Sequence, residues 1–109
     1  MRVRISLFFL SIIMLMAFSM KTEKKITIWL IGDSTMSVKE PKAYPETGWG
    51  MPFVHFWDSS ITIENRAKNG RSSKSFLAEK LWAPILAGLK EGDYVFIQFG
   101  HNDEAKEEK

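Results

Sequence analysis

Three short polar segments contain the residues that could carry out a chemical reaction. Ser34 belongs to a Gly-Asp-Ser-Thr segment, Gly70 follows Asn69, and Asn102 belongs to a Gly-His-Asn-Asp segment. A serine hydroxyl attacks a carbonyl carbon once a base has taken its proton. The oxyanion that forms needs preorganised donors, and the backbone N–H of Gly70 and the side-chain amide of Asn102 are suitable. The N–H of Ser34 is a further donor if this residue begins a helix. This set of residues predicts ester hydrolysis or another acyl transfer.

Each segment alone has a simpler interpretation as a turn or a helix cap. Their spacing favours a common role, because Gly70 follows Ser34 by 36 residues and Asn102 follows Gly70 by 32 residues. A strand, its crossover and the next parallel strand together take roughly 30 residues. The three segments are therefore expected to end three successive strands.

The stretches between these segments predict an α/β fold. Apolar runs rich in β-branched and aromatic residues indicate strands at 25–31, 61–65 and 94–99. Apolar residues at helical intervals indicate a helix over 51–57 and another that Ser72 or Ser73 caps and that extends to Trp82. Pro84 starts a further helical turn. Strands that alternate with helices predict a parallel sheet with right-handed crossovers. Ligands bind beyond the carboxyl ends of such strands, where all three polar segments lie.

Composition excludes several classes of protein. The 109 residues are 45% hydrophobic and 26% charged, which is typical of a globular domain, and none is cysteine. A disulfide-stapled fold, a thiolate metal site, a catalytic thiol and a lipidated cysteine are thereby excluded. From residue 20 onward, 13 basic residues balance 13 acidic ones. This neutral balance gives no electrostatic reason to expect a nucleic-acid partner.

The first 19 residues are expected to be an export signal. Arg2 and Arg4 precede an apolar run over 5–18, and Ala17 and Ser19 are small residues at the positions that a signal peptidase requires. The alternative is an uncleaved membrane anchor, but 5–20 is shorter than the roughly 20 residues that span a bilayer. The sequence therefore predicts an exported protein, periplasmic or extracellular, with no stable membrane span after cleavage. Residues 20–109 are expected to belong to one domain.

Taken together, the segments at 31–36, 65–76 and 96–103, with Gly48-Trp49-Gly50, resemble the SGNH (GDSL-type) hydrolases. They are most similar to the rhamnogalacturonan acetylesterase branch, over about residues 26–103. The resemblance implies Ser34 as nucleophile and Gly70 and Asn102 as oxyanion donors, with Asp33 and His101 as supporting residues. It also implies a three-layer α/β/α sandwich around a five-stranded parallel sheet, with no metal and no organic cofactor.

One departure from the family concerns the general base. The family uses a histidine near the C-terminus with an aspartate three residues before it. This chain has only His55 and His101, and Pro52 and Gln98 lie three residues before them. We expect a structural role for His55 and a structural or substrate-contacting role for His101. With three strands in place of five, the chain is expected to be the N-terminal part of an SGNH domain, truncated after the third strand and inactive alone.

Three functions are compatible with these observations. The first is a serine ester hydrolase that deacetylates pectic polysaccharide, since aromatic residues such as Trp49 suit stacking on sugar rings. The second is an SGNH esterase or lipase that acts on another small acyl ester. The third is a non-catalytic carbohydrate-binding remnant, which would bind sugar without turnover.

Overall fold

Three parallel strands form the single sheet of the computed structural model, which describes residues 24–104. The strands are β1 (Ile26–Gly32), β2 (Ile61–Asn65) and β3 (Tyr94–Gln98), in the spatial order β2-β1-β3. Both pairings with the central β1 are parallel. The three predicted strands and their parallel arrangement are confirmed.

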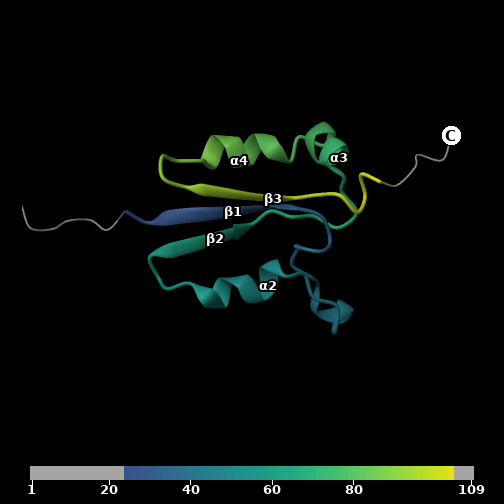
Figure 1. Ribbon diagram of the computed structural model, residues 1–109, viewed down its shortest axis with the longest axis horizontal. Coiled ribbons are helices and arrows are strands. Elements are labelled where there is room, and N and C mark those ends of the chain that lie inside the picture. The colour runs from purple at the N-terminus through teal and green to yellow at the C-terminus, as the bar shows by residue number, and fades with distance from the viewer. Residues whose placement is uncertain (1–23, 105–109) are drawn as a thin grey trace, which may run out of the picture.

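Helices cover both faces of this sheet (Figure 1). Between β1 and β2 the chain forms the 3₁₀ turn η1 (Pro41–Ala43), α2 (Gly50–Phe53) and the 3₁₀ turn η2 (Val54–Phe56). Between β2 and β3 it forms α3 (Ser73–Ala78) and α4 (Trp82–Gly88). Helix α2 lies on one face, and α3 and α4 lie on the other (Figure 1). The α/β/α layering is the one that the resemblance implied.

The central strand β1 packs against both helical layers because its side chains alternate between the two faces. Trp29 and Ile31 pack with Phe76 of α3 and Ile85 of α4. Ile28 and Leu30 face the other way, and with Met36 they form a second cluster that Phe53 of α2 contacts. Burial on both sides is the reason that the β1 sequence is almost continuously apolar.

Two predicted helices differ in extent from the observed ones. The single helix expected to reach Trp82 is wrong, because α3 ends at Ala78 and Lys80 has a left-handed φ of 58°. Its expected cap is correct, since the Ser72 hydroxyl accepts a hydrogen bond from the N–H of Ser75. The helix expected over 51–57 consists of α2 followed by the 3₁₀ turn η2, and Phe56 is 80% exposed rather than on a packed face.

The strand register brings the three carboxyl ends to one edge. Gly32 at the end of β1 lies opposite Gln98 at the end of β3, and Leu30 lies opposite Asn65 at the end of β2. After β2 the chain continues beside β1, since the N–H of Lys68 donates to the carbonyl of Gly32 over 2.9 Å. The loops that follow the three strands therefore start side by side (Figure 1).

The predicted export signal at residues 1–19 lies outside the described residues. Within residues 24–104, no helix has the length and apolar character needed to cross a membrane.

Candidate active site

Ser34 lies in a tight turn directly after β1. The carbonyl of Asp33 accepts hydrogen bonds from the N–H groups of Met36, at 3.2 Å, and Ser37, at 3.1 Å. The chain makes this single turn and no helix follows, so the N–H of Ser34 is not at a helix N-terminus. Ser34 is partly exposed, and its hydroxyl has no hydrogen bond to another residue of the described part of the chain. The turn thus presents the hydroxyl without a protein partner.

The buried side chain of Asp33 stabilises this turn through hydrogen bonds to Thr35. Its side chain is fully buried, and Oδ1 accepts from the N–H and the hydroxyl of Thr35, at 3.0 and 2.8 Å. Its Oδ2 is buried and has no hydrogen-bond partner among residues 24–104. A carboxylate that accepts from the residue two positions later closes an Asx-type turn. Asp33 therefore fixes the backbone on the C-terminal side of Ser34.

A chain of side-chain hydrogen bonds joins this turn to the end of β3. The Gln98 amide donates through Nε2 to the Thr35 hydroxyl over 2.6 Å. The Trp49 indole donates through Nε1 to Gln98 Oε1 over 2.8 Å. Trp49 is 38% exposed, and its ring packs against that of Phe53 in a T-shaped contact, with the ring centroids 5.4 Å apart. Trp49 is thus held at the rim of the site with part of its surface open.

The loop after β1 is also joined to the loop after β2. The Lys39 ammonium donates to Asn69 Oδ1 over 2.9 Å, and the Ser37 hydroxyl donates to the same oxygen. Asn65 Nδ2 donates to the carbonyl of Met36 over 3.0 Å. The backbone packing is close here, since a Cβ added at Gly48 would lie 2.0 Å from the Ser37 carbonyl oxygen. The first two loops thus form one packed unit.

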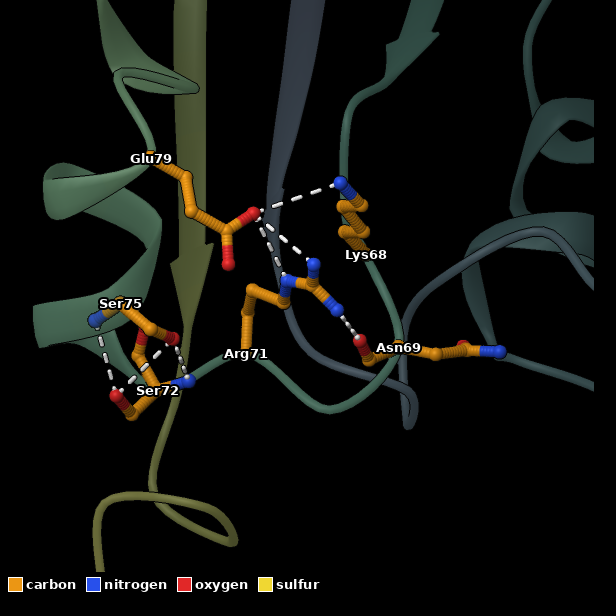
Figure 2. A network of polar contacts seen from close by, with 6 residues as sticks. All are labelled: Lys68, Asn69, Arg71, Ser72, Ser75 and Glu79. Atoms are coloured by element: carbon orange, nitrogen blue, oxygen red, sulfur yellow. Dashed lines mark hydrogen bonds and ion pairs between the residues drawn. The ribbon is translucent and has the colours of Figure 1, made fainter.

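Gly70 has a φ of +72°, a conformation that L side chains rarely adopt, and an added Cβ would have no neighbour within 4 Å. The residues around it are held by a charged network (Figure 2). Glu79, at the end of α3, accepts from Arg71 Nη2 over 3.0 Å and pairs with Lys68 at 3.5 Å. The Arg71 hydrogen bond holds the pKa of Glu79 below its usual value. Arg71 also donates to the carbonyl of Asn69 over 3.0 Å (Figure 2).

The loop after β3 is fastened to the loop after β2. Asn102 donates through Nδ2 to the carbonyl of Arg71 over 3.1 Å. Asp103 accepts from the N–H of Ser73 over 3.0 Å and from the Ser73 hydroxyl. The Ser73 hydroxyl lowers the pKa of Asp103, and the backbone N–H adds to this effect. Since Asn102 Nδ2 carries two hydrogens, one N–H is left for a ligand.

The structure brings the loops of Ser34, Gly70 and Asn102 together at one edge of the sheet, as the sequence predicts. Their roles as nucleophile and oxyanion donors stay predictions. A hollow of about 490 Å³ lies between the loops after β1 and β2, and its polar lining residues are Ser37, Lys39, Glu40, Lys42, Lys68, Asn69 and Arg71. Ser34, Gly70 and Asn102 are not among the residues that line it.

The two histidines contribute no contact to this geometry. His55 lies exposed in η2, and His101 lies exposed in the loop after β3. Within residues 24–104 neither donates to or accepts from Ser34, and the same residues hold no cluster of three or more acidic or histidine side chains that could bind a metal. The expected roles of His55 and His101 stay predictions.

Sequence reasoning missed Lys39, Thr35 and Gln98. A lysine in a proline-containing loop is typical of the surface, and nothing in the sequence marks it as buried. Gln98 is the last residue of a strand and gives the clearest signal, because a polar side chain at a strand's carboxyl end faces the ligand edge.

The chain resembles several known esterases in sequence. A scan against models of protein families finds no match. The chain is 40% identical over 82 residues to the rhamnogalacturonan acetylesterase RhgT of Bacillus subtilis, a match that covers 75% of this chain and 35% of that protein. It is 45% identical over 78 residues to a rhamnogalacturonan acetylesterase of Emericella nidulans, with 71% and 28% covered.

A solved structure shares the fold. The crystal structure of the YxiM protein of Bacillus subtilis matches with a TM-score of 0.67 at 32% identity, covering 73% of this chain and 23% of that one. The chain thus spans about a third of the length of the curated relatives it matches, or less.

Proposed function

We propose that the chain belongs to the SGNH hydrolases, with the rhamnogalacturonan acetylesterases among its relatives, and that it supplies the nucleophile and two oxyanion donors of a serine ester hydrolase. The observation that carries the proposal is the direct linkage of three loops at the carboxyl edge of the sheet. Lys39 and Ser37 join the first to the second, and Asn102 joins the third to the second.

In this proposal the Ser34 hydroxyl attacks the carbonyl carbon of an acetyl ester. A C–O bond forms from Ser34 Oγ, the proton leaves to a base, and the carbonyl oxygen becomes an oxyanion. Gly70 N–H and the second N–H of the Asn102 amide stabilise that charge, which exists only beyond the ground state. Collapse of the intermediate breaks the bond between the carbonyl carbon and the sugar oxygen, which takes the proton back from the base, and it leaves an acetyl-serine. Water then hydrolyses the acetyl-serine to acetate and free Ser34.

The proposal assigns no general base to residues 24–104, since neither histidine there contacts Ser34. Serine depends on an adjacent base for its nucleophilicity. A second candidate function follows from the same observation: carbohydrate binding without turnover.

We propose acetylated pectic polysaccharide as the substrate. Two of the relatives are named rhamnogalacturonan acetylesterases. Trp49 is held at the rim by Gln98 with part of its indole exposed, which suits stacking on a sugar ring.

The test is acetate release from acetylated rhamnogalacturonan by the full-length protein that contains these residues and its general base, as wild type and as Ser34→Ala. We expect Ser34→Ala to reduce release to the background rate, because the attacking oxygen is lost. Ser59→Ala is the matched control, since Ser59 is an exposed serine in the turn before β2, at the opposite edge of the sheet. Equal release by wild type and Ser34→Ala would refute the proposed nucleophile. Saturable sugar binding with no release from either would favour the binding function.

A further inference from the structure

The ammonium group of Lys39 is buried against the turn that contains Ser34. The Lys39 side chain is only 3% exposed, although lysine side chains are almost never buried without partners. Its Nζ donates to the carbonyl of Ser34, to the Ser37 hydroxyl over 3.0 Å and to Asn69 Oδ1 over 2.9 Å. Three acceptors use all three hydrogens of the ammonium.

The partners of Lys39 come from two different halves of the proposed site. The Ser34 carbonyl belongs to the nucleophile residue itself, whereas Asn69 immediately precedes Gly70, the proposed oxyanion donor. Lys39 and Asn69 are 30 residues apart in the chain, and the Lys39 side chain contacts both loops at once. The Ser37 hydroxyl and the Asn65 amide add further hydrogen bonds between the same segments. Glu46 lies 3.4 Å from the ammonium, and 62% of its side chain is exposed, so the countercharge is in contact with water.

We propose that Lys39 is a positioning residue for ester hydrolysis, which holds the Ser34 turn and the Asn69–Gly70 turn at the separation that the reaction requires. The inference rests on the proposed function. Lys39 acts through the two turns and does not contact the substrate. Geometry of this kind is exacting, because a displacement of about 1 Å at reacting groups costs a factor on the order of 10² in rate.

Lys42 offers a matched control for Lys39. It belongs to the same loop, carries the same charge and lines the same hollow. Its side chain is 84% exposed, and it pairs with Glu40 alone, over 2.8 Å. A substitution there removes an equal charge from the neighbourhood of the site without touching either turn.

The first test compares Lys39→Met with Lys42→Met in the full-length protein that contains these residues and its general base, using p-nitrophenyl acetate. Methionine keeps an unbranched side chain of similar length, and the exposed Glu46 is not left buried without a partner. We expect kcat of Lys39→Met to fall on the order of 10²-fold while KM changes by less than about threefold, since ground-state binding is untouched. The kcat and KM of Lys42→Met should equal those of the wild type.

Chemical rescue separates the ammonium from packing alone. The chain contains no cysteine, so Lys39→Cys introduces the only thiol. Its thiolate sulfur displaces bromide from 2-bromoethylamine, and the resulting side chain again ends in an ammonium. We expect this treatment to raise the kcat of Lys39→Cys at least about tenfold. The same treatment should leave the kcat of Lys42→Cys unchanged.

The outcomes distinguish this inference from the proposed function. If Ser34→Ala abolishes turnover but Lys39→Met and Lys42→Met have equal kcat, the positioning role is refuted and the proposed function stands. If the full-length protein, with its general base in place, has no Ser34-dependent turnover, the proposed function fails. The backbone amide resonances of Thr35 and Gly70 then decide: shifts of both in Lys39→Met but not in Lys42→Met support the linkage, and unchanged resonances overturn it.

Discussion

The loop after β1 and the loop after β3 meet at the same site but are held in opposite ways. In the first loop Asp33 and Met36 are fully buried, and Ser37 and Lys39 are 2% and 6% exposed. In the third loop the residues that follow Gly100 are largely exposed: His101, Asp103 and Glu104. The first loop packs into the hydrophobic core through Met36, whereas the third loop lies on the surface of the protein.

This difference separates two requirements of the proposed chemistry. Ser34 is positioned by a turn that Met36 anchors in the core cluster of β1 and that Lys39 supports from beneath. Asn102 is positioned by a single hydrogen bond to the Arg71 carbonyl, and its loop by the contacts of Asp103 with Ser73. Changes in the first loop should therefore affect folding and catalysis together, whereas changes in the third loop should affect catalysis with little cost in stability.

The largest effect that separates the two loops is expected from Asn102→Ala. Loss of one oxyanion donor lowers kcat by about 10²–10³, and KM should stay close to wild type because the oxyanion forms only after binding. The melting temperature should change little, since the side chain makes one hydrogen bond at a partly exposed position. Steady-state kinetics and thermal unfolding measure both quantities. A variant with normal kcat, or one that unfolds at a much lower temperature, would show that the loops do not differ in this way.

A smaller effect is expected from pH at the third loop. Because the Ser73 hydroxyl and N–H lower the pKa of Asp103, the ionised carboxylate stabilises the folded loop at neutral pH. This stabilisation is lost at acid pH, as the pH falls from the ordinary pKa of an aspartate through the lowered pKa of Asp103. The amide proton resonance of Ser73, which donates to Asp103, should shift in that range while the folded spectrum of the β1 residues persists.

Asp103→Asn is the control for this titration. Its amide oxygen can still accept from the Ser73 N–H, but it does not titrate, so the Ser73 resonance should lose its acid transition. An identical transition in wild type and Asp103→Asn would assign the effect to another group.

The same contrast explains which features the sequence predicted. The strand over Ile61–Asn65 and the cap at Ser72 follow from local patterns, alternation in one case and a hydroxyl at a helix start in the other. The break at Lys80 was missed because a left-handed residue is usually signalled by glycine, and a lysine gives no such signal. Tertiary packing there overrides the apolar spacing that predicted one helix.

The placement of the site loops was predictable, but the contacts that fix them were not. Strand order and spacing are enough to bring Ser34, Gly70 and Asn102 to one edge. The burial of Lys39 depends on Asn69, and the Trp49–Gln98 hydrogen bond joins residues 49 positions apart. Such contacts form only when the loops pack against each other, so they cannot be predicted from composition or from the periodicity of apolar residues.

A crystal structure of the chain after reaction with a serine-directed phosphonate tests the roles of Ser34, Gly70 and Asn102 together. We predict phosphorus bonded to Ser34 Oγ, with one phosphoryl oxygen accepting hydrogen bonds from Gly70 N–H and Asn102 Nδ2. An adduct on another residue, or a phosphoryl oxygen directed away from both donors, would contradict these roles.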